Sequence, residues 1–146
     1  RTTQVTRPTI AFTSGCFDLL HEGHIHLIHT MRNLVGNDGV VSIAVNSDAY
    51  IRRKKGREPV HTVQERINKL RYTGLVNELS CFNEDGPLAL ILRIRPDYIV
   101  VGDDYALEQI VGCAECRSGE WPCEVVRVPR LPGFSTTQIL TQRKVS

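Results

Sequence analysis

The sequence predicts an α/β fold, a Rossmann-like doubly wound sheet of about five parallel strands with helices on both faces. Short β-branched and apolar runs alternate with amphipathic segments along the chain, and repeated β–α alternation is typical of parallel strands joined by crossover helices. The run Val40–Val45 is apolar almost throughout, which indicates an interior strand buried on both faces. No internal repeat or low-complexity stretch interrupts this pattern.

The first strand is expected at Thr9–Thr13, a β-branched and aromatic run. A helix is expected after Gly23, where helical spacing relates the apolar residues Ile25, Leu27, Ile28, Met31, Leu34 and Val35. The second strand is Val40–Val45, and the polar segment Asn46–Asp48 after it offers a helix N-cap.

The basic stretch Ile51–Pro59 carries too much charge for the core, and we expect a solvated loop there. Another helix begins at His61 and Thr62, because Thr62 and Glu65 have the spacing of a capping box. Its apolar face comprises Val63, Ile67 and Leu70.

The remaining elements continue the alternation, and Pro87 suits the first turn of a helix. Three further strands are expected at Leu79–Phe82, Tyr98–Gly102 and Glu124–Val128. Three further helices are expected at Leu88–Ile94, Leu107–Cys113 and from Ser135 to Leu140.

Length and composition indicate one globular domain over residues 1–146, with 41% apolar and 23% charged residues. No apolar run approaches the roughly 20 residues of a membrane-spanning helix, and the polar start Arg1–Gln4 carries no signal peptide. We therefore expect a cytoplasmic protein with no membrane partner. The missing initiator Met leads us to expect a trimmed chain or an excised domain. A net charge of +2 gives no reason to expect a nucleic-acid partner.

Four polar segments follow predicted strands. They are the turn that contains His21 and His24, the basic stretch, Gly102–Asp104 and the helix start at Ser135. Because parallel sheets bind ligands beyond the carboxyl ends of their strands, we expect all four at one edge of the sheet.

Four of the chain's five histidines stand at positions 21, 24, 26 and 29. His21 and His24 fall on a strand-to-helix turn, where backbone N–H groups and the positive end of the helix dipole favour a phosphate. A structural metal is the alternative, but His24, His26 and His29 spread around the helix and no carboxylate completes the set. A third interpretation is a helix end with solvated histidines. We interpret His21 and His24 as a pair, with His26 and His29 structural or solvated.

The segment Gly15–His24, GCFDLLHEGH, resembles the HxGH signature of the cytidylyltransferase-like nucleotidyltransferases. Four further motifs stand in that family's order: Asn46–Ala49 (NSDA), Arg53–Gly56 (RKKG), Glu65–Arg66 and Phe134–Thr137 (FSTT). The resemblance extends from Thr9 to Gln142.

This resemblance implies transfer of a nucleoside monophosphate from a nucleoside triphosphate to a phosphorylated polyol or sugar, with release of pyrophosphate. Catalysis would consist of positioning and charge stabilisation during in-line attack on the α-phosphorus. His21 and His24 would donate to phosphate oxygens in the transition state, and Lys55 would reach the triphosphate from a loop that orders over substrate. Mg²⁺ is expected with the triphosphate, with Asp18 a candidate neighbour. Arg52, Arg53, Lys54 and Arg57 are interpreted as solvated charge.

The other site residues come from the same resemblance. The acceptor phosphate would be bound by Asp18, Arg66 and Arg130, since arginine binds phosphate bidentately. Hydroxyls at the helix that begins at Ser135 would bind the β- and γ-phosphates, although a plain N-cap is the alternative there. The expected nucleotide-binding residues are Ser14, Gly15, Cys16, Phe17, Gly23, Gly102, Asp103, Asp104, Ser135, Thr136 and Thr137.

Two subgroups of the family share features with this chain. The stretches NSDAYIRRKKG, EDGPLALILRIRPDYIVVGDDY and LPGFSTTQI resemble adenylyltransferases that activate heptose 1-phosphate. Gly102–Asp104 and Arg130 resemble glycerol-3-phosphate cytidylyltransferase instead, although Cys16 stands where such enzymes usually have threonine. We favour CTP with an acceptor such as glycerol 3-phosphate, and ATP with heptose 1-phosphate is the alternative. A homodimer is expected because dimers are common among the relatives.

The chain has five cysteines, an odd number, and without a secretory signal reduced thiols are expected. Cys113, Cys116 and Cys123 have partial zinc-site spacing but lack a fourth ligand nearby, so partly buried thiols are favoured over zinc. The functional alternative is a non-catalytic nucleotide- or metal-binding module. Intact His21, His24, Lys55 and Ser135–Thr137 argue against the nucleotide-binding module, and metal analysis would decide on the metal-binding one.

Overall fold

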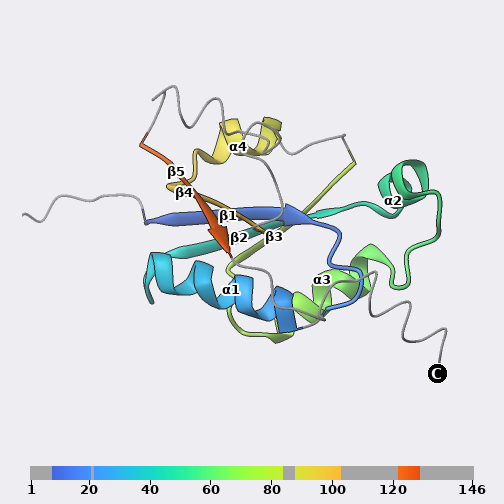
Figure 1. Cartoon of the computed structure of the whole chain (residues 1–146), viewed down its shortest axis with the longest axis horizontal. Coiled ribbons are helices and arrows are strands. Elements are labelled where there is room, and N and C mark those ends of the chain that lie inside the picture. Colours follow the sequence, from blue (N-terminus) through green and yellow to red (C-terminus); the bar gives the residue numbers. More distant parts are fainter. Residues whose placement is uncertain (1–7, 21, 84–87, 103–121, 129–146) are drawn as a thin grey trace, which may run out of the picture.

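The computed structural model describes residues 8–20, 22–83, 88–102 and 122–128. Within them, five strands form one sheet in the order β3-β2-β1-β4-β5, and all four strand pairings are parallel. Figure 1 shows helices above and below this sheet. The doubly wound Rossmann-like architecture that the alternation predicts is confirmed.

Apart from α2, the bounds of the elements in the described residues lie close to the predicted ones. The strands are β1 (Ile10–Gly15), β2 (Val40–Asn46), β3 (Glu78–Phe82), β4 (Tyr98–Gly102) and β5 (Glu124–Val128). The helices are α1 (Glu22–Val35), α2 (Asp48–Lys55), α3 (Val63–Tyr72) and α4 (Leu88–Ile94). The helices predicted at 107–113 and from Ser135 lie outside the described residues.

Each face of the sheet has its own buried core, because successive side chains of a strand point to opposite faces. The face under α1 and α3 holds Ala11, Ile28, Met31, Val41, Ile43, Val45, Leu70, Val100 and Val128. The face under α4 holds Phe12, Ala44, Phe82, Ile91 and Ile99. Among the helices in the described residues, none combines the length and the apolar character that a bilayer crossing requires.

The basic stretch is a loop only in its second half, so that part of the prediction is wrong. Its first half belongs to α2, which begins after Ser47, whose hydroxyl accepts from the backbone N–H of Tyr50 at 3.0 Å. The helix ends at Gly56, which has φ +66° and donates its N–H to the carbonyl of Arg52. Glycine adopts this left-handed conformation without a steric penalty. Local capping therefore offsets the low apolar content of the segment.

The capping box predicted for α3 is confirmed. The Thr62 hydroxyl accepts from the Glu65 N–H at 3.2 Å, and the Glu65 carboxylate accepts from the Thr62 N–H at 2.8 Å. Hydrogen bonds from the backbone N–H and the side chain of Thr62 lower the pKa of the Glu65 carboxyl below its usual value. The box fixes where α3 begins and thereby the position of Arg66, the residue after Glu65.

Candidate functional site

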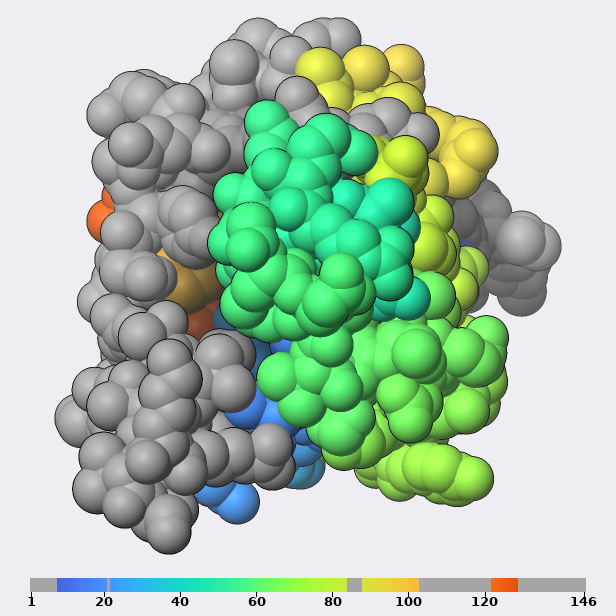
Figure 2. Space-filling view, turned by 90° about the vertical axis from the view of Figure 1, so that its right-hand side faces the viewer, coloured from blue at the N-terminus to red at the C-terminus, as the bar shows by residue number. Residues whose placement is uncertain are grey.

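The order of the strands marks one edge of the sheet as the candidate ligand-binding edge. The chain winds outward from β1 in both directions, to β2 and β3 on one side and to β4 and β5 on the other. Ligands of such sheets bind outside the carboxyl ends of the strands at this reversal. β1 ends at Gly15 and β4 at Gly102, so these two predicted nucleotide-binding residues, with Ser14 and Cys16, lie at the switch point. Figure 2 looks at this end of the molecule, where α2 and the segment after it stand beside the blue residues of the β1–α1 region.

The β1–α1 turn is built around Phe17. This residue has φ +50°, which is uncommon for a side chain other than glycine, and such strain concentrates at functional sites. Its buried ring packs against the imidazole of His24, with ring centroids 5.0 Å apart and planes tilted by 50°. A Cβ on Gly15 would lie 3.2 Å from the same ring, so glycine leaves room for it. The half-buried His24 is thereby oriented in the first turn of α1.

The basic side chains of α2 differ in what holds them. Arg52 pairs with Glu58 at 2.8 Å on the surface, and Arg53 donates to the carbonyl of Asn83 at 2.8 Å and stacks over the ring of Tyr50. Lys55 is exposed, and the structure gives it no hydrogen bond or ion pair within the described residues. The arginines are thus engaged by the protein, whereas the Lys55 ammonium is open to solvent.

Asp18 is buried and accepts three hydrogen bonds from the segment between α2 and α3. Its side chain is 1% exposed, and the backbone N–H groups of Val60 and His61 donate to it at 2.8 and 2.9 Å. The guanidinium of Arg57 completes the set at 2.9 Å. Burial raises the pKa of the Asp18 carboxyl, but the two N–H bonds and Arg57 together lower it below its usual value. Arg57, interpreted from the sequence as solvated, is therefore paired with a buried charge.

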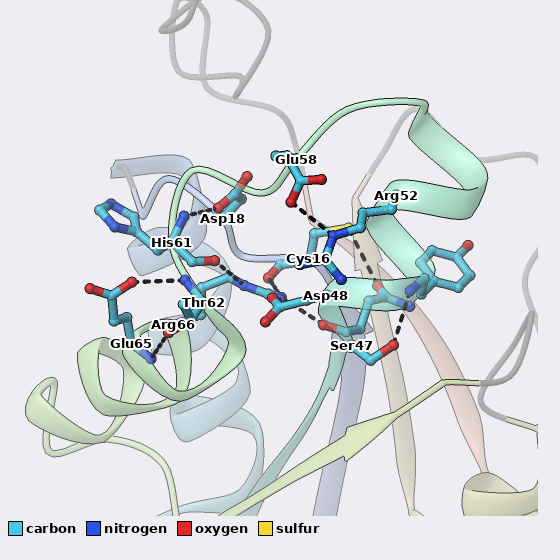
Figure 3. Close-up of polar contacts among 12 residues, drawn as sticks. Cys16, Asp18, Ser47, Asp48, Arg52, Glu58, His61, Thr62, Glu65 and Arg66 are labelled. Atoms are coloured by element: carbon cyan, nitrogen blue, oxygen red, sulfur yellow. Dashed lines mark hydrogen bonds and ion pairs between the residues drawn. The ribbon is translucent and has the colours of Figure 1, made fainter.

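Arg66 is completely buried, and its guanidinium joins three parts of the chain (Figure 3). Nη1 donates to the carbonyls of Cys16 at 2.8 Å and Asn46 at 2.7 Å, which lie at the ends of β1 and β2. Nε donates to the carbonyl of His61 at 3.1 Å, and Nη2 donates to Asp48 at 2.6 Å. Charge-assisted hydrogen bonds of this kind are the strong ones.

Asp18 and Arg66 thus have protein partners where the sequence analysis expects contacts with the acceptor or with Mg²⁺. The carboxylate of Asp18 binds three donors, and Arg66 uses four N–H groups on partners within the protein. For Arg66 the physical reason is that the carbonyl groups at strand ends need donors where no further strand residue supplies one. Neither residue is exposed to a small-molecule ligand in this structure.

Several predicted site residues lie outside the described residues: His21, Asp103, Asp104, Arg130, Ser135, Thr136 and Thr137. Cys113 and Cys116 do so as well, and Cys123 is half-buried just before β5. His26 and His29 are exposed on α1. Within the described part of the chain, no group of three or more His, Cys, Asp or Glu side chains is arranged to hold a metal ion.

Three polar participants were missed at the level of sequence: Asn46, Asp48 and Arg57. Asn46 supplies a carbonyl to Arg66 and accepts from the Cys16 thiol, with Sγ 3.5 Å from Oδ1. Asp48 stands in the N-cap segment, which indicates where a helix starts but gives no sign of ion pairing. Arg57 is hidden in a run of like charges, and nothing local distinguishes it from its neighbours.

Comparison with known proteins places the chain in one family. Residues 12–142 match the family model described as Cytidylyltransferase-like. The chain is 42% identical over 134 residues to the Bifunctional protein HldE of Acidiphilium cryptum and 42% identical over 132 residues to that of Koribacter versatilis. These matches cover 91% and 90% of this chain but 26% of each relative. The chain therefore spans about a quarter of the length of these curated relatives.

Solved structures share the fold at low sequence identity. A lipopolysaccharide core biosynthesis protein from Thermoplasma volcanium aligns with a TM-score of 0.69 and 20% identity, over 86% of this chain and 99% of its own. A pantoate-beta-alanine ligase from Francisella tularensis aligns with a TM-score of 0.62 and 17% identity, over 98% and 72% respectively. At such identities the likeness supports the fold alone.

Proposed function

This chain belongs to the cytidylyltransferase-like family, and from this premise we propose that it is an adenylyltransferase acting on a sugar 1-phosphate such as heptose 1-phosphate. Nucleotidyltransferase chemistry comes with the family. The choice of ATP is supported by the HldE relatives at about 40% identity and by the three stretches that resemble heptose 1-phosphate adenylyltransferases. Those relatives move the preference from CTP, favoured by Gly102–Asp104 and Arg130, to ATP.

The observation that carries the nucleotidyl transfer, for ATP and CTP alike, is the placement of His24. Its imidazole is held by Phe17 in the first turn of a 14-residue helix, beside the switch point where parallel sheets bind ligands. The positive end of the helix dipole favours anions there. A donor held in this way stabilises phosphate charge without having to reorganise during the reaction.

In the proposed reaction, an oxygen of the acceptor phosphate bonds to the α-phosphorus of the triphosphate. The bond from that phosphorus to the bridging β-phosphate oxygen breaks, and its electron pair leaves with pyrophosphate. His24 and His21 donate to the α-phosphoryl oxygens as charge develops, and Lys55 neutralises the leaving phosphates. Ser135, Thr136 and Thr137 are assigned to the β- and γ-phosphates, and Arg130 to the acceptor.

Mg²⁺ fits this scheme as an ion carried by the triphosphate. Asp18, which stands three residues before the HxGH motif in sequence, is occupied by three donors. When bound, the ion neutralises phosphate charge. The homodimer stays a prediction, and light scattering coupled to size-exclusion chromatography measures it.

A second candidate is transfer of CMP from CTP to a polyol phosphate such as glycerol 3-phosphate. The Gly102–Asp104 form and the position of Arg130 favour it. Pyrophosphate release should therefore be screened with ATP, CTP, GTP and UTP against heptose 1-phosphate, other sugar 1-phosphates and glycerol 3-phosphate. Turnover with ATP and a sugar 1-phosphate supports the proposal. Turnover with CTP and glycerol 3-phosphate alone replaces it with the second candidate.

A further inference from the structure

We propose that Asp18 and Arg66 are positioning residues of the transfer reaction, which hold the β1–α1 turn and the α2–α3 segment in register and bind no substrate. The inference rests on the proposed function, because the groups that they would position are His24 and Lys55. It assigns both residues a role different from the acceptor contact that the sequence suggests.

The first argument is that Asp18 connects the β1–α1 turn, which precedes His24, to the end of α2, which contains Lys55. Asp18 stands three residues before His21, and Arg57 stands two residues after Lys55. The ion pair between them, at 2.9 Å, therefore links the histidine turn to the end of α2 by a short path. The N–H groups of Val60 and His61 bind the same carboxylate. Together with the bond from Arg57, three hydrogen bonds therefore connect the two segments.

The second argument is the position of Arg66. Its guanidinium binds the carbonyl of Cys16, two residues before Asp18, and the carbonyl of His61, which also donates its N–H to Asp18. Asp18 and Arg66 thus both connect the β1–α1 turn to the segment between α2 and α3. Arg66 also binds Asp48 in the first turn of α2. Arg66 therefore fixes the beginning of α2, and Asp18, through Arg57, fixes the chain just beyond its end.

The third argument is exposure. Arg66 is 0% and Asp18 1% exposed, whereas Lys55 is exposed. A phosphate could reach the guanidinium of Arg66 only after the bonds to the strand ends were broken. Burial of this kind fits residues that position His24 and Lys55. Misplacement of catalytic groups by about 1 Å can lower a rate by roughly a hundredfold.

The test compares Arg66→Lys and Arg57→Gln with the matched control Arg52→Gln, in kinetics with the substrate pair that the wild type uses. Arg57 and Arg52 are arginines of the same basic stretch. Among the described residues each forms an ion pair, with a buried partner for Arg57 and an exposed partner for Arg52. We expect kcat to fall about a hundredfold in Arg66→Lys and about tenfold in Arg57→Gln, with acceptor KM within about twofold of wild type. Arg52→Gln should stay within about twofold of wild type in both constants.

A rise in acceptor KM of about tenfold or more in Arg66→Lys, with kcat unchanged, would show a substrate ligand and overturn the proposal. A kcat near the wild-type value in Arg57→Gln would overturn it too, and this variant keeps the test decisive if Arg66→Lys does not fold.

A second readout does not depend on activity. Amide hydrogen exchange at Val60 and His61 should become faster in Arg57→Gln than in Arg52→Gln, because the carboxylate that binds both amides loses its charge partner. Unchanged exchange would contradict the proposal even in an inactive protein. A wild-type chain that releases no pyrophosphate would refute the proposed function instead, so the two failures are distinguishable.

Discussion

Replacement of Arg66 by methionine tests how much the buried guanidinium contributes to stability. Methionine retains much of the apolar stem of arginine but provides no donor. The carbonyls of Cys16, Asn46 and His61 would lose their hydrogen bonds, and Asp48 would lose its ion-pair partner. The side chain of Asp48 is 23% exposed, so water can solvate that carboxylate, whereas Arg66 itself is fully buried.

The expected magnitude follows from these contacts. An unsatisfied buried polar group costs about 1–3 kcal/mol, and removal of one partner from a buried pair costs about 3–5 kcal/mol. We therefore expect Arg66→Met to lower the free energy of unfolding by about 3–5 kcal/mol, a large part of the roughly 5–15 kcal/mol typical of a domain.

Urea unfolding followed by circular dichroism measures this free energy, and an unchanged m-value would show that the unfolded state is comparable. Arg52→Met is the matched control, because Arg52 and Glu58 are 53% and 73% exposed and such pairs contribute at most about 1 kcal/mol. A loss in Arg66→Met no larger than in Arg52→Met would refute the argument that the guanidinium sustains the strand ends.

The remaining predictions concern His24, Asp18 and Thr62. His24→Ala should unfold like the wild type but lose about a hundredfold or more in pyrophosphate release; near-normal turnover would remove His24 from the mechanism. The pKa of Asp18 is lowered in the folded state, so its stabilisation is complete above the unfolded value of about 4 and is lost as the pH falls below it. The stability difference between wild type and Asp18→Asn should therefore shrink in urea titrations on going from pH 6 to below about 4, and a constant difference would count against this linkage. Thr62→Ala, which removes one half of the capping box, should cost about 1 kcal/mol in thermal or urea unfolding, and no loss would mean that tertiary packing alone fixes the start of α3.

Most of the fold could be predicted because its signals are local. The strand Tyr98–Gly102 has the predicted bounds, since continuous apolar runs mark strands buried in a parallel sheet. Glu124–Val128 has the predicted bounds as well, although charged Glu124 and Arg127 interrupt its apolar residues. The start of α3 followed from Thr62 and Glu65, whose side chains bond to backbone three residues away. The basic segment was misassigned because charge shows that a segment is outside the core but does not separate helix from loop. Ser47 and Gly56 were the capping signals that decide it.

The contacts of Arg66 and Asp18 could not be predicted, because their partners are distant in sequence. Arg66 reaches carbonyls 50 and 20 residues away, and Asp18 binds amides 42 and 43 residues away. An arginine in a motif near a phosphate site has the same local sequence whether it binds phosphate or strand ends. Tertiary structure alone distinguishes the two cases, since it determines burial.

The transfer of label from ATP tests the proposed reaction most directly. The wild-type chain would be incubated with Mg²⁺, heptose 1-phosphate and ATP labelled at either the α- or the γ-phosphate, and the products separated by chromatography. Adenylyl transfer predicts that the α-label enters a sugar nucleotide and the γ-label enters pyrophosphate, with neither product formed by His24→Ala at a comparable rate. Label that stays in ATP would contradict the proposal, and so would a labelled sugar nucleotide that forms only when labelled CTP replaces labelled ATP.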